Sequence, residues 1–83
     1  MPKFKKKPVI IEAVQFTGDN WEELDKFITV PFTAFVAEQY ITIPTGAGDY
    51  KVELNDWIIK GAHGEFYPCN PDIFKETYEE LLE

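Results

Sequence analysis

The stretch from Asn55 to Leu82, NDWIIKGAHGEFYPCNPDIFKETYEELL, decides the fold. Two apolar segments, Trp57–Lys60 and Glu65–Cys69, flank the Gly61–Gly64 turn, a pattern that predicts a β-hairpin. Pro68 lacks an amide hydrogen, which places the second strand at an edge or beside a bulge. A helix follows directly, and we expect the upstream chain to pack against this unit.

That C-terminal helix carries the clearest start signal in the chain. Asn70 is a preferred N-cap residue, Pro71 suits the first helical position, and Asp72 meets the positive end of the helix dipole. One side of the helix is lined, at helical spacing, by the mostly apolar residues Ile73, Phe74, Thr77, Tyr78, Leu81 and Leu82. The pattern predicts an amphipathic helix that docks through this face.

The upstream chain begins with PVIIEAVQF, residues 8–16, whose β-branched content predicts a strand. Its apolar residues fall on both faces, which favours an interior strand covered on both sides. A short helix is expected next, because Asn20 and Glu23 form a capping pair and Pro31 ends the segment. One face of that helix carries Trp21, Leu24, Phe27 and Ile28.

Three further strands are expected in the middle of the chain, at residues 32–36, 40–44 and 50–54. The last alternates cleanly, which points Tyr50, Val52 and Leu54 inward. Together these signals predict one α+β domain over residues 8–83. It has five or six mostly antiparallel strands, one short helix after the first strand and the C-terminal amphipathic helix.

Charge and cysteine content limit the kinds of partner. Residues 1–7 form a basic arm with Lys3, Lys5, Lys6 and Lys7, whereas the remaining chain has four lysines against fifteen acidic residues, a net charge of −11. Because residues 8–83 are so acidic, nucleic acid is an unfavourable partner. The basic arm is expected to be a solvated tail. One cysteine permits no internal disulfide, which fits a reducing cytoplasm. No apolar run approaches the ~20 residues that span a bilayer.

No catalytic, cofactor or metal site is predicted. The chain has neither Arg nor Ser, and His63 and Cys69 are separated by about 20 Å of extended strand, too far for a nucleophile pair. One His and one Cys cannot close a zinc site. The spacing of Glu12, Glu53, Asp56 and Glu65 brings no two carboxylates together.

Glu12 stands out because it interrupts an otherwise apolar strand. If it is buried it needs a partner, for which Lys60 or the hydroxyl of Tyr67 or Tyr78 is available. The aromatic residues Trp21, Trp57, Phe66, Tyr67, Phe74 and Tyr78 are expected to serve mostly as core. Any that remain accessible could line a groove, because aromatic anchors are favoured at interfaces. The candidate binding residues are therefore Trp21, Trp57, Tyr67, Tyr78 and Glu12.

The segment GEFYPCNPDIFKETYE, residues 64–79, resembles a motif in a family of small uncharacterised proteins encoded by bacteriophages and prophages. That family opens with a basic arm and a KKPVVIEA-type strand and ends with a Pro-Gly-Asp turn, a WIIKG-type strand and a GEFYPC-PDIF-x-x-TYE tail. Residues 6–16, 56–61 and 64–79 match these parts. Leu54 and Asn55 stand where the family has Pro-Gly, and Asn tolerates the positive φ such a turn requires.

The resemblance implies a phage or prophage origin and action in the bacterial cytoplasm, but it supplies no activity. With an acidic body and no catalytic set, we expect a non-enzymatic accessory protein. It would bind a host or phage protein through its acidic surface or an exposed strand edge. The alternative is a protein that binds or sequesters a small, nucleotide-like molecule by aromatic stacking. Unpaired strand edges also make a homodimer possible.

Overall fold

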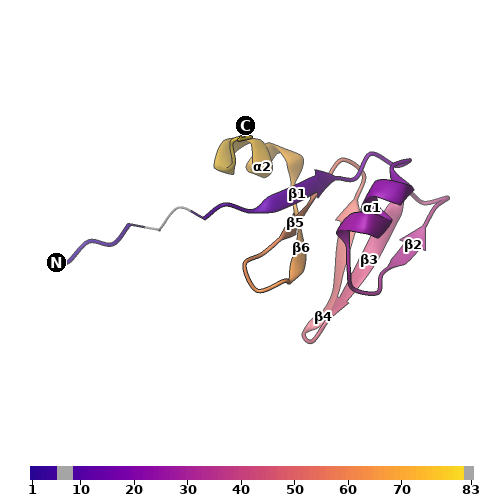
Figure 1. The fold of residues 1–83 in the computed structure, drawn as a ribbon, viewed down its shortest axis with the longest axis horizontal. Helices are drawn as coiled ribbons and strands as arrows, with labels where there is room; N and C mark the ends of the chain where they lie inside the picture. Colours follow the sequence, from indigo (N-terminus) through magenta and orange to yellow (C-terminus); the bar gives the residue numbers. More distant parts are fainter. Residues whose placement is uncertain (6–8, 82–83) are drawn as a thin grey trace.

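The computed structural model describes residues 1–5 and 9–81 (Figure 1). Within these residues there are six strands and two short helices, an α+β fold as predicted. The elements in chain order are β1 (Glu12–Gln15), α1 (Trp21–Phe27), β2 (Thr33–Phe35), β3 (Tyr40–Thr45), β4 (Gly48–Glu53), β5 (Trp57–Lys60), β6 (Phe66–Cys69) and α2 (Pro71–Thr77).

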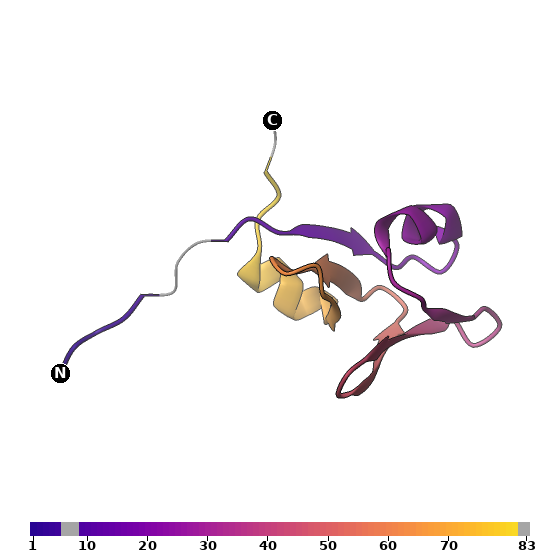
Figure 2. The ribbon, with the colours of Figure 1, turned by 60° about the horizontal axis from the view of Figure 1, so that its bottom comes forward.

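The strands form two three-stranded sheets, all antiparallel in their pairing. Sheet A has the order β1-β5-β6, and sheet B has the order β2-β3-β4. The predicted hairpin is therefore confirmed as β5 and β6, with Trp57 opposite Cys69 and Ile59 opposite Tyr67. Figure 2 shows α2 against sheet A, on the side away from α1 and sheet B.

The core lies between the inner face of sheet A, sheet B and α1. Its buried members, which are all hydrophobic, are Phe16, Leu24, Ile28, Ile41, Ile43, Val52, Ile58 and Phe66. Among residues 1–5 and 9–81 no polar or charged side chain is buried, so this core needs no internal hydrogen-bond network. Its driving force is burial of aliphatic and aromatic surface.

Helix α1 docks through the face that its sequence predicts. Leu24 and Ile28 are buried, and Trp21 and Phe27 pack against the same cluster. Asn20 is the N-cap residue, as predicted, but its side chain makes no cap hydrogen bond to the helix backbone. Instead, the Asn20 Nδ2 atom donates to the carbonyl of Gln15 (2.7 Å) and to Glu23 (2.8 Å), which ties the helix start to the end of β1.

The first strand is shorter than expected, and its position in the sheet differs. In the described part of the chain β1 is an edge strand with β5 as its neighbour, so the expectation of an interior strand is wrong. Long-range pairing decides this, and side-chain periodicity carries no information about it. Residues 1–5 of the expected basic arm are exposed, whereas Lys6, Lys7 and Pro8 lie outside the described residues.

Helix α2 begins as predicted and ends early. The Asn70 side chain accepts from the backbone amides of Asp72 and Ile73, and Pro71 occupies the first position. The helix ends at Thr77 and buries no residue completely. Of its predicted apolar face only Phe74 and Tyr78 are half-buried; Ile73, Thr77 and Leu81 are exposed, and Leu82 lies outside the described residues.

The alternating sequence of residues 50–54 predicts more buried side chains than the structure shows. Val52 is fully buried, but Tyr50 and Leu54 remain 45% and 39% exposed. Leu54 lies just beyond the last residue of β4, and Tyr50 is exposed although Ile43, directly opposite it, is buried. The turn that follows is as expected from the sequence: Asn55 has a φ of 73°, and its amide donates to the carbonyl of Phe16 (2.7 Å).

Candidate functional site

Three of the predicted binding residues, Trp57, Tyr67 and Tyr78, come together on the outer face of sheet A. Phe74 of α2 joins them, and we call these four residues the α2 dock. The Trp57 and Phe74 rings stack with centroids 4.2 Å apart, and the Phe74 and Tyr78 rings lie 4.9 Å apart. Because the Trp57 and Phe74 rings stack on each other and the Tyr78 ring packs against Phe74, these contacts fix the helix to the sheet.

Two titratable groups in or beside the α2 dock, the Tyr67 phenol and the Cys69 thiol, have a raised pKa. Burial raises the pKa of the Tyr67 phenol above its ordinary value of 10.0, and the neighbouring Tyr78 adds to the shift. Burial also raises the pKa of the Cys69 thiol above 9.0, with a further contribution from the Asp56 carboxylate. The position before the α2 N-terminus therefore does not lower the thiol pKa, and the thiolate that acts as a nucleophile is disfavoured.

His63 and Cys69 lie at opposite ends of the β5–β6 hairpin. Cys69 is paired with Trp57, whereas His63 lies in the exposed turn between Lys60 and Phe66. The His63 amide donates to the Glu65 carboxylate (3.0 Å), so this carboxylate stabilises the turn. The register thus keeps the single imidazole and the single thiol apart.

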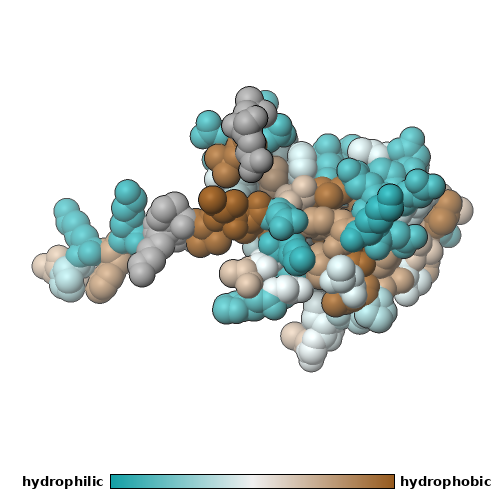
Figure 3. Space-filling model, in the orientation of Figure 1, coloured by the Kyte–Doolittle hydropathy of each residue, from teal (hydrophilic) through white to brown (hydrophobic). Residues whose placement is uncertain are grey.

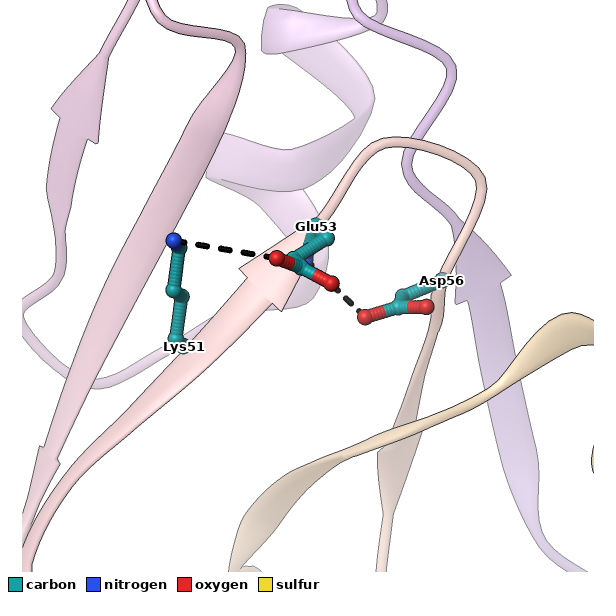
Figure 4. Close-up of polar contacts among 3 residues, drawn as sticks. All are labelled: Lys51, Glu53 and Asp56. Atoms are coloured by element: carbon teal, nitrogen blue, oxygen red, sulfur yellow. Dashed lines mark hydrogen bonds and ion pairs between the residues drawn. The ribbon is translucent and has the colours of Figure 1, made fainter.

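Glu53 and Asp56, two of the candidate carboxylates, lie together near the β4–β5 turn (Figure 4). The Asp56 carboxylate accepts a hydrogen bond from the Glu53 amide (2.9 Å), and Glu53 pairs with Lys51 at 3.7 Å. Both Lys51 and Glu53 side chains are more than half exposed, so the ion pair contributes little to stability. The geometry here is that of a stabilised turn.

Glu12 is exposed and separate from the other candidates. Its strand neighbour is Lys60, which lies opposite in the β1–β5 register. Both side chains belong to the inner face of sheet A, the face that carries Val14 and Ile58, whereas the α2 dock lies on the outer face. Glu12 therefore does not meet Tyr67 or Tyr78.

Trp21 forms a different surface, on α1. An open depression of about 670 Å³ is lined by Asp19, Asn20, Trp21, Glu22, Glu23 and Lys26. The Trp21 ring is half-buried and lies 5.4 Å from the Phe16 ring, which holds it in place from below. We call this the α1 surface: one positioned indole with three carboxylates and one ammonium around it.

A third aromatic group was not anticipated from the sequence. Phe35 and Tyr40 are directly opposite in the β2–β3 hairpin and stack with centroids 4.4 Å apart on the outward face of sheet B. The Lys51 Nζ atom lies 4.6 Å from the centre of the Tyr40 ring. The sequence feature that could have predicted this pair is the short turn between the two aromatic residues, because a short turn places its flanking residues opposite each other on neighbouring strands.

In the described part of the chain, no three His, Cys, Asp or Glu side chains are grouped so that they could hold a metal ion. The same residues include no helix that is both long enough and apolar enough to cross a membrane.

Comparison with known proteins returns no matching family model, no matching curated protein and no matching solved structure. The class is therefore defined by the coordinates alone: a small α+β protein with two antiparallel sheets and one helix docked on each side of sheet A.

Proposed function

We propose that this protein is a non-enzymatic accessory protein of a phage or prophage that binds a host or phage protein in the bacterial cytoplasm. The binding site we propose is the α1 surface. The observation that supports it is the half-buried Trp21 ring in an open depression edged by Asp19, Glu22 and Glu23. Tryptophan is among the residues that contribute most to protein–protein binding energy.

The chemistry of the α1 surface indicates the kind of partner. A carboxylate rim favours a segment rich in lysine or arginine, because complementary charge raises the association rate and fixes the orientation. The chain as a whole carries a net charge of −7, which adds long-range attraction for such a partner. Trp21 then offers an apolar contact at the centre of the charged rim.

Trp21 is also held in position before binding. Its contact with Phe16 connects it to a residue that is fully buried in the core. A side chain that is already ordered loses less conformational entropy on association. The small-molecule alternative has less support. In the α2 dock the Trp57 ring stacks on the Phe74 ring, and in sheet B the Phe35 ring stacks on the Tyr40 ring.

The test compares two charge reversals on the same helix. Glu22 lines the depression, whereas Asp25 is exposed on α1 without lining it. Wild-type protein and both variants, Glu22→Lys and Asp25→Lys, are immobilised and exposed to bacterial lysate at low and high salt. We expect wild type and Asp25→Lys to retain the same partner, and Glu22→Lys to lose it.

High salt should release that partner, because the attraction is between exposed charges. The proposal fails if no protein is retained specifically, or if Glu22→Lys retains the partner as well as Asp25→Lys does. A thermal-shift screen against nucleotides and metabolites addresses the alternative, because a bound ligand raises the melting temperature by mass action. A shift with one compound, together with no retained protein, would favour small-molecule binding.

A further inference from the structure

β4 has the longest edge among the outer strands in the described part of the chain. These outer strands are β1 and β6 in sheet A and β2 and β4 in sheet B. β2 has only three residues, and β6 contains Pro68, which lacks an amide hydrogen. At the end of β1, the Gln15 carbonyl already accepts from the Asn20 side chain (2.7 Å). β4 has six residues and no proline, so it offers the most complete edge.

Hydrogen bonds at both ends of β4 show which of its backbone groups point away from β3. At the start of the strand, the Gly48 carbonyl accepts from the Thr45 hydroxyl (2.5 Å), so Gly48 is directed toward β3. At the end, the Glu53 amide donates to the Asp56 carboxylate (2.9 Å), and the Glu53 carbonyl accepts from the Asp56 amide (3.0 Å). Glu53 is therefore directed away from β3. Successive residues alternate in an antiparallel ladder, and the two ends agree with one alternation.

Asp49 and Lys51 are the two residues inside β4 whose amides and carbonyls this alternation directs to the free side. Both side chains are exposed. Figure 2 shows the β3–β4 ribbon projecting from the rest of the molecule, and Figure 3 shows its tip in the pale colours of intermediate hydropathy. A Cβ atom added at Gly48 would meet no atom within 4 Å, so the space beside the strand start is open. Such an edge is a site for addition of another strand.

We propose that a second copy of this chain occupies the β4 edge, with the two β4 strands paired antiparallel about a two-fold axis at Tyr50. Asp49 of each copy then lies opposite Lys51 of the other copy. These residues exchange four backbone hydrogen bonds through the groups directed to the free side. The two copies of sheet B become one continuous sheet of six strands.

The charges of β4 favour both this occupant and this register. The proposed axis creates two opposite-charge pairs of Asp49 with Lys51, and directly opposed opposite charges stabilise a pair of strands. An axis at Asp49 or at Lys51 would instead place like charges opposite each other, which is destabilising. A two-fold interface requires a self-complementary surface, and one acid and one base on either side of the axis provide it.

Tyr50 supplies the centre of the pairing. Its side chain is 45% exposed, although Ile43, directly opposite it in the β3–β4 ladder, is buried. In the proposed register the two Tyr50 side chains meet in a non-hydrogen-bonded pair, the position where opposed side chains are closest. Pairing thus covers a ring that the single chain leaves exposed. No residue of α1 takes part, so this inference is independent of the proposed function.

The first experiment exchanges the two charges. Lys51→Glu alone opposes carboxylates across the interface, and Asp49→Lys alone opposes ammonium groups. Sedimentation velocity should show wild-type dimers and, for each variant, a dissociation constant raised roughly tenfold or more. An equimolar mixture of the two variants restores both opposite-charge pairs and should associate as the wild type does. The variants have net charges of −9 and −5, two units either side of −7, so overall charge does not attract them to each other.

Matched controls make the same charge changes away from β4. Lys75→Glu on α2 and Asp25→Lys on α1 lie at exposed positions and should leave association unchanged. Added salt should reduce the difference between wild type and the β4 charge variants, because the paired side chains are accessible to solvent.

The second experiment removes a backbone donor. Lys51→Ala loses the charge and retains the amide hydrogen, whereas Lys51→Pro loses both, so their comparison isolates the hydrogen bond. The lost amide points to the free side, and the β3–β4 ladder is retained. The dissociation constant of Lys51→Pro should exceed that of Lys51→Ala roughly tenfold or more, because each dimer loses two intermolecular hydrogen bonds. Circular dichroism checks that both variants are folded.

A wild-type chain that stays monomeric at high micromolar concentration overturns the proposal. A mixture of Lys51→Glu and Asp49→Lys that associates no better than either variant alone also overturns it, as does folded Lys51→Pro that dimerises as tightly as Lys51→Ala. If Lys51→Pro does not fold, the mixing experiment still decides the matter, because both charge substitutions lie at exposed side chains.

Discussion

The two faces of sheet A are built from the same three strands but differ in how tightly they are packed. The inner face places Ile58 and Phe66 in a closed core against sheet B and α1, where both are almost fully buried. The outer face places Trp57, Ile59 and Tyr67 beside a seven-residue helix; Ile59 is almost fully buried, whereas Trp57 and Tyr67 remain partly exposed. Because successive side chains point to opposite faces, the same strands form two hydrophobic layers, and these layers are packed to different degrees.

The difference follows from what covers each face. The inner face is covered by sheet B and α1, which enclose Ile58 and Phe66 as interior packing requires. The outer face has only α2, too short to be helical on its own, held by the Asn70 cap and by contacts of Phe74 and Tyr78. We infer that the inner face sets global stability and that α2 can detach from a folded body.

The largest effect should come from opening a cavity on the inner face. Ile58 is fully buried, so Ile58→Ala loses both apolar transfer free energy and packing contacts. We expect the free energy of unfolding to fall by about 3 kcal/mol in a urea titration, a large fraction of the total for so short a chain. A loss below about 1 kcal/mol would show that the inner face is not the main core.

On the outer face the corresponding substitution is Phe74→Ala. It removes the ring stacked on Trp57, and we expect a loss of about 1–2 kcal/mol, with Trp57 fluorescence shifted to longer wavelength because the indole becomes more hydrated. Ile73→Ala is the matched control on the same helix, since Ile73 is exposed, and it should change stability by less than about 0.5 kcal/mol. Equal losses for Phe74→Ala and Ile58→Ala would remove the distinction between the faces.

Alkaline pH should loosen the outer face selectively. The pKa values of Tyr67 and Cys69 are raised in the folded state, so folding favours their neutral forms. Their contribution is fully present below the ordinary values of 10.0 and 9.0 and is lost as pH rises through the raised folded-state values. Urea unfolding should give constant stability up to about pH 9 and a decline above it.

Cys69→Ala separates the two groups. Because the thiol has the lower ordinary pKa, the variant should retain constant stability further into the alkaline range, and the remaining decline should come from Tyr67. Identical pH profiles for wild type and Cys69→Ala would show that the thiol does not contribute.

The smallest effect concerns the turn that leads into β5. Asn55 has a φ of 73°, a conformation that glycine adopts without the steric cost of a Cβ atom. Asn55→Gly should therefore raise the free energy of unfolding by up to about 0.5 kcal/mol, partly offset by the greater flexibility of the unfolded chain. A clear destabilisation would show that the Asn side chain itself stabilises the turn.

Local signals predicted local structure well. The Asn70-Pro71 pair located the start of α2, the glycines at 61 and 64 located the hairpin turn, and the spacing from Trp21 to Ile28 located the buried face of α1. In each case a few neighbouring residues determine the backbone conformation. The turn at Asn55 is of the same kind.

The errors concern contacts between distant parts of the chain. Which strand lies at an edge, how far α2 extends, and whether Tyr50 and Leu54 are covered all depend on what packs nearby. The same limit applies to the candidate residues. Trp57, Tyr67 and Tyr78 share a face through the β5–β6 register and the α2 dock, whereas Trp21 and Glu12 belong to separate surfaces. Residue type alone could not predict which of these candidate residues share a surface.

Hydrogen exchange measured residue by residue tests the difference between the two faces most directly. The Phe74 and Tyr78 amides are hydrogen-bonded within α2, and the Ile58 and Ile59 amides belong to the central strand of sheet A. We predict that the two α2 amides exchange through local opening, far faster than global unfolding allows, and that Ile58 and Ile59 exchange only when the whole protein unfolds. Equal protection at all four amides would mean that α2 unfolds only together with the core, which would contradict a helix that detaches from a folded body.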